Sequence, residues 1–371
     1  MRIGILTLPL HTNYGGILQA YALQTVLERM GHEVEVFDRP YTFNISFWKK
    51  CLAYPKRMFC KYVLRRNIIV RCEKYATHVN LVKRQFTQPF VDKYIKRRVV
   101  KSVSEIHRND YDAIVVGSDQ IWRPMYFWNI ANAFLDFATG WKIKRIAYAP
   151  SFGVDKWEYN EKQTTVCKEL LSKFDAVSVR ELSGVQLCKN YLGRSAEWVL
   201  DPTLLLHVDD YKVLYEKKNT PKSNGTLLIY ILDSSAEAEK LTKTVSERMG
   251  FAPFRVNSRI EDASASLNER VQPPVEQCLR GFNDAKYIVT DSFHACVFSI
   301  LFRKPFAVYA NKKRGISRIE SLLGYLGLEN RIVRDASDSV QLEDIDYEEV
   351  YKKLNEMRRK SFDFLESSLK S

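Results

Sequence analysis

The sequence predicts an α/β fold with two Rossmann-like domains, residues 1–205 and 206–371, a basic helical insert at 41–104 and a C-terminal helix. Three observations predict this fold. Short apolar runs alternate with segments of helical periodicity in both halves, as in parallel βαβ units. A chain of 371 residues has the length of two ordinary domains. A polar, lysine-rich stretch at 212–225 separates the two α/β runs.

In the first domain we expect parallel strands at 3–8, 33–37, 113–116, 145–149, 176–179 and 198–200. A helix at 17–30 joins the first two strands, because its apolar residues recur on one face and Gly31 provides a C-terminal stop. In the second domain we expect strands at 227–232, 254–256, 287–290 and 306–309, with helices at 236–249, 275–282, 294–302 and 317–326. Residues 347–369 have the pattern of a charged amphipathic helix.

The net charge of +13 is concentrated in the segment 41–104, where 16 lysines and arginines face only Glu73 and Asp92. Aromatic residues lie among these charges. This composition is typical of a surface that meets an anionic membrane or a nucleic acid. A solvated helical insert with a basic outer face fits the composition equally well.

The cysteines and the apolar runs indicate a cytoplasmic protein. Seven cysteines occur singly with no CxxC pair, which argues against a zinc knuckle or a disulfide framework. The apolar run at the N-terminus is shorter than a signal peptide and is interpreted as the first core strand. No run approaches the roughly 20 apolar residues of a spanning helix. The only DxD, at 344–346, is interpreted as surface charge, so no metal site is indicated.

The strand-to-helix turn at 291–294 is the strongest candidate for chemistry. Ligands of open α/β sheets bind at the carboxyl ends of strands, where helix N-termini offer unpaired N–H groups. His294 is placed there beside Ser292, and it could act as a general acid next to an anion. A lone histidine is more often structural, but a basic loop follows the next strand and favours function. That loop consists of Lys312, Lys313 and Arg314.

The first domain offers two further loops of this kind. Residues 11–16 lie between a strand and a helix, and their glycines allow either contact with an anion or sugar or simply a tight turn. Asp119, Gln120 and Trp122 follow another strand and suit sugar hydroxyls, although Asp119 could cap a helix and Trp122 could pack in the core. Neither loop has the GxGxxG spacing or a Walker motif.

Arg180 ends the strand at 176–179. An arginine there can bind a carboxylate or a phosphate through both of its terminal nitrogens. It could instead pair with Glu181 or Asp201 as part of the structure.

Five of these motifs, in this order, resemble the polysaccharide pyruvyltransferase family from the first strand to about residue 331. They are Asn13-Tyr14-Gly15-Gly16, the segment 116–122, Ser178-Val179-Arg180-Glu181, Leu200-Asp201-Pro202-Thr203 and Asp291-Ser292-Phe293-His294. The resemblance implies a GT-B-like fold and transfer of pyruvate from phosphoenolpyruvate to a sugar as a ketal. In the family an arginine two residues before the active-site histidine helps to hold phosphoenolpyruvate. Ser292 replaces it here, so Arg180 and the basic loop would carry more of that binding.

The resemblance also implies the partners. Phosphoenolpyruvate is the donor substrate, and no cofactor is expected. The acceptor would be a sugar, carried on a polyprenyl diphosphate at the inner face of the membrane, in surface or capsular polysaccharide synthesis. The basic insert would suit that peripheral location, and no nucleic acid is expected. The residues expected to face the acceptor are Asn13, Tyr14, Gly15, Gly16, Asp119, Gln120 and Trp122.

Two alternatives belong to other functional classes. A nucleotide-sugar glycosyltransferase of the same fold would need an acidic residue late in the second domain to bind the ribose, and only Glu320 is a candidate. A non-catalytic protein that binds anionic lipid or nucleic acid would be built around residues 41–104.

Overall fold

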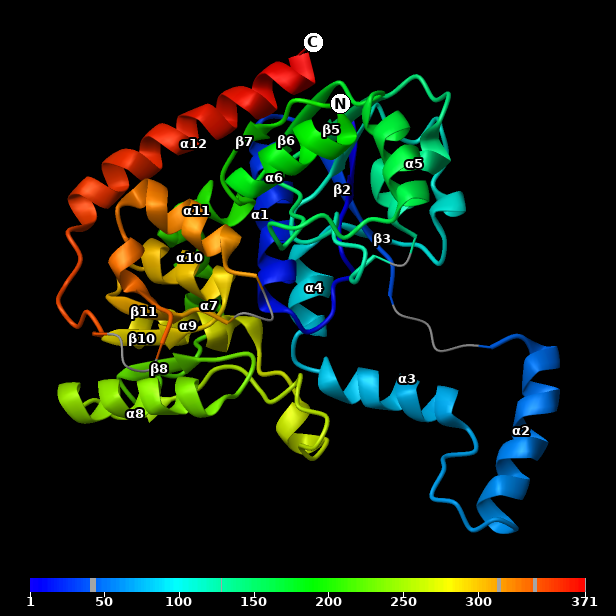
Figure 1. The fold of residues 1–371 in the computed structure, drawn as a ribbon, viewed down its shortest axis with the longest axis horizontal. Coiled ribbons are helices and arrows are strands. Elements are labelled where there is room, and N and C mark those ends of the chain that lie inside the picture. The colour runs from blue at the N-terminus through cyan, green and yellow to red at the C-terminus, as the bar shows by residue number, and fades with distance from the viewer. Residues whose placement is uncertain (41–44, 128, 312–314, 336–338, 371) are drawn as a thin grey trace.

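The computed structural model describes residues 1–40, 45–127, 129–311, 315–335 and 339–370. It contains a seven-stranded and a five-stranded sheet, both parallel, with helices packed on them (Figure 1). The architecture is the predicted α/β fold with two Rossmann-like halves.

The seven-stranded sheet forms the N-terminal half, in the order β3-β2-β1-β4-β5-β6-β7. Its strands are β1 (Arg2–Leu6), β2 (Glu33–Asp38), β3 (Arg97–Val99), β4 (Ala113–Val116), β5 (Lys144–Ala147), β6 (Ala176–Val179) and β7 (Glu197–Trp198). All four residues of β4 are buried, as expected for a parallel sheet that is covered on both faces. Its α-helices include α1 (Tyr14–Arg29), α5 (Glu161–Leu171) and α6 (Leu182–Leu187).

The five-stranded sheet has the order β12-β11-β10-β8-β9. Its strands are β8 (Leu227–Tyr230), β9 (Pro253–Phe254), β10 (Tyr287–Thr290), β11 (Phe306–Tyr309) and β12 (Ile332–Val333). The helices of this half are α7 (Val208–Lys217), α8 (Ala236–Met249), α9 (Val275–Asp284), α10 (Phe293–Leu301) and α11 (Ser317–Leu326). Because β10 is the central strand and wholly buried, its carboxyl end lies in the middle of the sheet edge.

Short helical turns complete the chain. They are η1 (Val103–Glu105), η2 (Ile130–Phe134), η3 (Asp136–Ala138), η4 (Cys188–Leu192), η5 (Pro202–Leu204), η6 (Asn268–Arg270) and η7 (Glu329–Arg331).

The C-terminal helix α12 (Tyr347–Lys370) runs from the second half onto the first (Figure 1). Near its start, the Tyr347 hydroxyl donates to the carbonyl of Lys304 at 2.6 Å. Further along, the Ser361 hydroxyl accepts from the amide of Leu200 at 3.0 Å. The helix therefore bridges the two halves, and the domain boundary at residue 205 stays a prediction.

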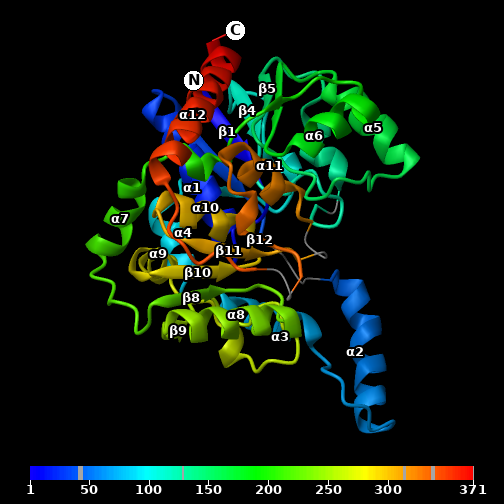
Figure 2. The same cartoon turned by 60° about the vertical axis from the view of Figure 1, so that its left-hand side comes forward.

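The basic segment is partly an insert and partly sheet. Helices α2 (Phe47–Tyr62) and α3 (Cys72–Lys83) extend away from the body (Figure 1), and the turned view shows α2 standing clear of it (Figure 2). Helix α4 (Gln88–Tyr94) returns to pack on α1, where the rings of Phe90 and Tyr21 lie 5.9 Å apart. β3 then adds an edge strand to the sheet, which the prediction of a helical insert over 41–104 had missed. None of the helices within the described ranges is both long and apolar enough to cross a bilayer.

Candidate functional site

His294 lies where the central strand of the second sheet meets a helix. It is the second residue of α10, and the Ser292 hydroxyl caps this helix by accepting from the amide of Ala295 at 3.4 Å. The apolar strand, the polar turn and the apolar helix in the sequence impose this placement. The His294 side chain is directed toward the N-terminal half, and the residue is only 8% exposed.

The histidine packs against the first turn of α1. A Cβ atom added to Gly15 would lie 2.0 Å from Nδ1 of His294, closer than any real contact. Gly15 is therefore needed for the two helix N-termini to meet. Asn13 fixes this turn, because its side-chain oxygen accepts from the amide of Gly15 at 3.0 Å.

The other ring nitrogen of His294 faces a buried ion pair. Nε2 lies 3.6 Å from Oδ2 of Asp201 and 3.5 Å from Nη1 of Arg180. Arg180 donates from Nη1 to Asp201 at 2.6 Å and from Nη2 to Asp119 at 2.9 Å. The side chains of Arg180 and Asp201 are wholly buried. Arg180 thus joins two carboxylates from different loops and fixes the surroundings of His294.

The charges of this cluster are set by burial and by one another. Burial would raise the pKa of Asp201, but contact with His294 and the charge of Arg180 hold it below its usual range. Burial acts on Asp119 in the same way, and the charge of Arg180 is the chief cause of its lowered pKa. Burial keeps the pKa of the neighbouring Glu181 raised. Asp119 and Asp201 are therefore ionised at neutral pH, as required to hold Arg180.

A second buried arginine, Arg318 in the first turn of α11, approaches the same place. The ring of Phe293 has Arg180 at 4.6 Å and Arg318 at 5.7 Å from its centroid. Burial and the charge of Arg180 lower the pKa of Arg318 to about 10, so its guanidinium is still cationic at neutral pH. Sequence reasoning did not name it as a site residue, although an arginine just after a basic loop at the carboxyl edge was a usable signal.

The two halves meet through the loops at these carboxyl edges. The Tyr14 hydroxyl lies 3.0 Å from the carbonyl of Val256 and 2.7 Å from that of Pro273. The amide of Leu182 donates to the Ser321 hydroxyl at 3.0 Å. His294 and Arg180 therefore face each other across a junction that several contacts hold closed.

The sequence profile that describes polysaccharide pyruvyl transferase matches residues 13–313, most of the chain. The chain belongs to the polysaccharide pyruvyl transferase family. No curated protein matches it.

Solved structures with little sequence identity resemble the chain along nearly its whole length. Arabidopsis thaliana UGT89C1 complexed with UDP-L-rhamnose shares 11% identity at a TM-score of 0.48, covering 97% of this chain and 98% of that one. E. coli ADP-heptose LPS heptosyltransferase II shares 10% at a TM-score of 0.35, covering 97% and 99%. The Neisseria meningitidis UDP-GlcNAc 2-epimerase bound to UDP-GlcNAc shares 9% at a TM-score of 0.45, covering 99% and 94%.

In this member of the polysaccharide pyruvyl transferase family, the expected acceptor residues fall into different places. Asp119 lies in the buried cluster. Its φ of 62° is in the left-handed region. Residues other than glycine rarely adopt this conformation, and those that do are often found at functional sites. Asn13 is exposed at the start of α1, where Gly15 and Gly16 are buried. Gln120 is half-buried, with its side-chain oxygen against the loop at Gly153.

Two aromatic residues from that prediction are buried. Trp122 has no exposed surface, its indole N–H donates to the carbonyl of Ala133 at 3.2 Å, and its ring stacks on Phe134. Tyr14 is buried too, with its hydroxyl at the junction described above. Trp122 is thus a core residue and not an aromatic platform, which corrects the expectation that it faces a sugar. The sequence also allowed Trp122 to pack in the core, and the structure agrees with that alternative.

The structure describes only some of the residues that were expected to bind the donor. Ser292 is buried beside His294, and Arg180 is occupied by two carboxylates. Lys312, Lys313 and Arg314 lie outside the described residues. Across the ranges that the structure describes, no group of three or more His, Cys, Asp or Glu is placed to hold a metal ion.

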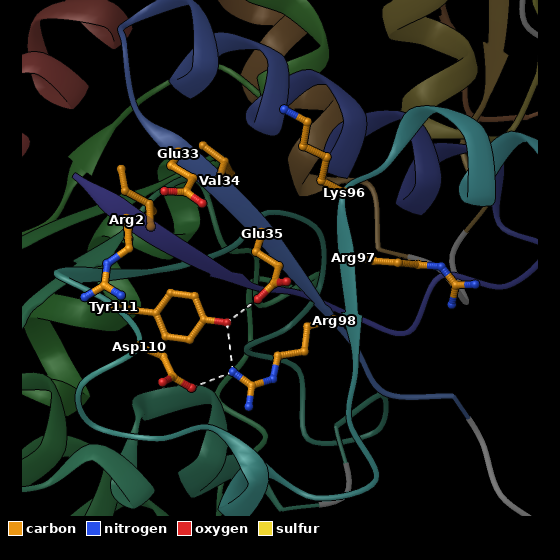
Figure 3. Close-up of a pocket in the computed structure, with 10 residues that line it drawn as sticks. Arg2, Glu33, Val34, Glu35, Lys96, Arg97, Arg98, Asp110 and Tyr111 are labelled. Carbon is orange, nitrogen blue, oxygen red and sulfur yellow. Dashed lines mark hydrogen bonds and ion pairs between the residues drawn. The ribbon is translucent and has the colours of Figure 1, made fainter.

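Two of the hollows in the described part of the chain differ in their position relative to His294. One of about 580 Å³ lies at the amino ends of β1, β2 and β3, opposite the edge that carries His294 (Figure 3). Its polar and charged groups bind one another: the Tyr111 hydroxyl donates to Glu35, and Arg98 donates to Asp110 at 2.6 Å.

The other hollow, of about 360 Å³, lies at the carboxyl ends of β8 and β9. It offers both donors and acceptors, including Arg255, Asn257 and Ser258. It adjoins the turn before His294, because Asp291 accepts from the amide of Leu232 at 2.8 Å. Of these two hollows, this one is on the side of the candidate site.

Proposed function

We propose that the protein transfers pyruvate from phosphoenolpyruvate to a sugar as a ketal, with His294 as the general acid. The observation that supports it most is the position of His294, between the first turn of α1 and the buried Arg180–Asp201 pair. A second cationic side chain, Arg318, lies 5.7 Å from the centre of the Phe293 ring, which Arg180 also contacts. Membership of the polysaccharide pyruvyl transferase family supports the transferase class.

The chemistry requires an acid next to an anion site. A proton from His294 joins the methylene carbon of the donor, and a sugar hydroxyl forms a C–O bond to the neighbouring carbon and gives its own proton back to His294. The bond from that carbon to the phosphate oxygen then breaks and releases inorganic phosphate. A second sugar hydroxyl forms the other C–O bond, gives its proton to the released phosphate and closes the ketal. Cationic groups must hold the carboxylate and the phosphate throughout.

The residues proposed for donor binding are Ser292, His294, Arg318 and the basic loop of Lys312, Lys313 and Arg314. We assign Arg180 a positioning role, because its two terminal nitrogens already hold Asp119 and Asp201. A phosphate near the N-terminus of α10 would gain from the unpaired amides of its first turn. This arrangement replaces the arginine that the family carries at the position of Ser292.

The acceptor is proposed to be a sugar on a polyprenyl diphosphate at the cytoplasmic face of the membrane, in surface or capsular polysaccharide synthesis. Its hydroxyls would enter at the carboxyl edge, where Asn13 is exposed and the hollow at β8 and β9 lies. Asp119 lies beside the same turn of α1, because a Cβ atom added to Gly16 would be 3.6 Å from its Oδ2 and from the Asn13 side chain.

The rival nucleotide-sugar glycosyltransferase gains no support from Glu320. The Oε1 atom of Glu320 accepts from Arg334 at 2.6 Å, so part of this carboxylate is already used in a surface ion pair.

The decisive experiment incubates the purified protein with phosphoenolpyruvate and lipid-linked oligosaccharides, and follows the pyruvyl mass increase together with released phosphate. We expect His294→Gln to lower turnover by roughly a hundred- to ten-thousand-fold, the usual contribution of a general acid. Stabilisation by phosphoenolpyruvate in a thermal shift should survive the substitution, since the cationic groups remain.

Near-normal turnover in His294→Gln would remove the histidine from this role. If the wild-type protein transfers a sugar from a UDP-sugar and forms no ketal, the proposed reaction itself is wrong.

A further inference from the structure

The projecting helices α2 and α3, which we call the arm, present an unusual exposed surface. None of the 16 residues of α2 is buried. Its large apolar side chains are between 50% and 78% exposed. They are Phe47, Trp48, Leu52, Met58, Phe59 and Tyr62. Exposed apolar surface on this scale marks an interaction site.

The apolar and basic residues of α2 occupy separate faces. At 3.6 residues per turn the six apolar side chains share one side of the helix, about 140° wide. The basic residues take the opposite side, and they are Lys49, Lys50, Lys56, Arg57 and Lys61. From residue 45 to residue 72 the chain has 8 lysines and arginines and no acidic residue.

We propose that α2 lies in the plane of an anionic bilayer, with its apolar face among the acyl chains and its lysines at the lipid phosphates. A helix with one apolar and one lysine-rich face is the pattern of an interfacial membrane helix. The absence of acidic residues from this segment matches the negative surface of such a membrane.

The separation of the faces favours lipid over other partners. Nucleic acid would need aromatic and basic side chains interleaved on one face, and it would leave Leu52 and Met58 uncovered. A symmetric contact with a second copy could cover the apolar face, but it would leave the lysine-rich face without an anionic partner. A bilayer surface satisfies both faces at once.

The arm is rooted beside the candidate site. Just after α3, the Thr87 hydroxyl donates to the carbonyl of His11, in the loop that leads to Asn13, at 2.8 Å. The carbonyl of Lys83, the last residue of α3, accepts from the amide of Gln272 in the C-terminal half at 2.9 Å. Docking by α2 would therefore hold the junction of the halves near the membrane. Only the presentation of a lipid-linked acceptor rests on the proposed function; the docking does not.

The test measures binding of the full chain to vesicles of phosphatidylcholine alone and of an equal mixture with phosphatidylglycerol. We expect binding to the mixture only, weakening steeply with added salt. Reversing Lys49, Lys56 and Lys61 to Glu should reduce binding at least about tenfold. Arg57 is left in place, because it binds Glu73 at 2.7 Å and the carbonyl of Val70 and so shapes the arm.

A matched control and a second variant complete the test. Reversal of three exposed lysines elsewhere, Lys240, Lys352 and Lys360, makes the same change in net charge and should leave binding close to wild type. Replacing Trp48, Leu52 and Phe59 with Ser should abolish binding with all charges kept. A blue shift of tryptophan emission on the vesicles should disappear in Trp48→Phe.

Binding that ignores salt, or that persists in both arm variants, would overturn the proposal. The proposal would also be wrong if the wild-type chain formed a dimer that the serine variant does not form, and if neither the wild-type chain nor any variant bound vesicles. Turnover of a short water-soluble acceptor should be unchanged in both arm variants. Vesicle binding does not require phosphoenolpyruvate. A failure of docking can therefore be distinguished from a failure of the proposed reaction.

Discussion

At the scale of single residues, the site depends on one arginine that serves two carboxylates. The planar fork of Arg180 binds Asp119 with one terminal nitrogen and Asp201 with the other. A lysine has no such fork and would lose this geometry. Because Asp201 also faces His294, the arginine fixes the imidazole without being exposed itself.

The contact between Gly15 and His294 gives the sharpest residue-scale prediction. Gly15→Ala places a methyl group 2.0 Å from Nδ1, so the imidazole must move. A displacement of about 1 Å from the reacting atoms can cost roughly a hundredfold in rate. We expect such a loss of turnover at temperatures where the variant is folded, a melting temperature lowered by the overpacked junction, and a displaced ring in a crystal structure of the variant.

Gly324→Ala, in α11, is the matched control, because its new methyl group would meet nothing closer than 3.7 Å and the residue has no expected role at the site. It should keep near-normal turnover. Equal activity in the two variants would show that the histidine does not need its observed position.

Asp201 provides a prediction of pH dependence. Its pKa in the folded protein lies below the ordinary value of 3.8, so its charge stabilises the fold above that value. That stability is lost as the pH falls through the lower folded pKa. Asp201→Asn keeps the shape without the charge and should cost about 3–5 kcal/mol at pH 7, as for a broken buried pair. Urea unfolding should show the gap between wild type and variant narrowing below about pH 4, and a constant gap would contradict this assignment.

At the scale of elements, the sequence predicted the buried strands and the long helices well. The apolar run of β10 and the amphipathic pattern of α12 carry their own periodicity, so each is readable without its neighbours. The two-residue β12 and the edge strand β3 were missed. β3 consists of Arg97, Arg98 and Val99, and its arginines pair with carboxylates around it. Nothing local distinguishes such a strand from a solvated basic loop.

The candidate site was predictable to the same extent. His294 follows from a strand, a polar turn and a helix, all adjacent in the sequence. The pairing of Arg180 with Asp119 and Asp201 joins three separate strand ends, so only the folded chain reveals it. Trp122 illustrates the same limit, because a tryptophan after a strand can face either a ligand or the core. Its stacking on Phe134, in the short helix η2, decided for the core.

The arm is an element for which the composition left membrane binding, nucleic-acid binding and a solvated insert open. From the sequence alone, the basic residues of 41–104 could not be assigned to different parts of the fold. The structure divides them, since Arg97 and Arg98 belong to the sheet whereas α2 stands clear of the body (Figure 2). This division allows the proposed docking to be tested on α2 without disturbing the fold.

At the scale of the whole molecule, the two halves share one apolar cluster. It includes Ile17 of α1, Phe298 of α10 and Leu365 of α12. The rings of Tyr148 and Phe364 approach to 6.1 Å where α12 crosses the first half. A continuous core of this kind predicts that the halves unfold together and not as separate domains.

Arg358 tests whether α12 holds the halves together. Its Nε donates to the carbonyl of Leu204 at 2.6 Å and Nη2 donates to that of Leu206, in the segment that joins the halves. Arg358→Ala removes the donors from two buried carbonyls, and each lost charged hydrogen bond costs about 1.5–3 kcal/mol. We expect the melting temperature to fall by several degrees. The neighbouring Arg359 is exposed, so Arg359→Ala should change stability by less than about 0.5 kcal/mol. Calorimetry of both variants checks this, and equal midpoints would mean that α12 only covers the surface and does not join the halves.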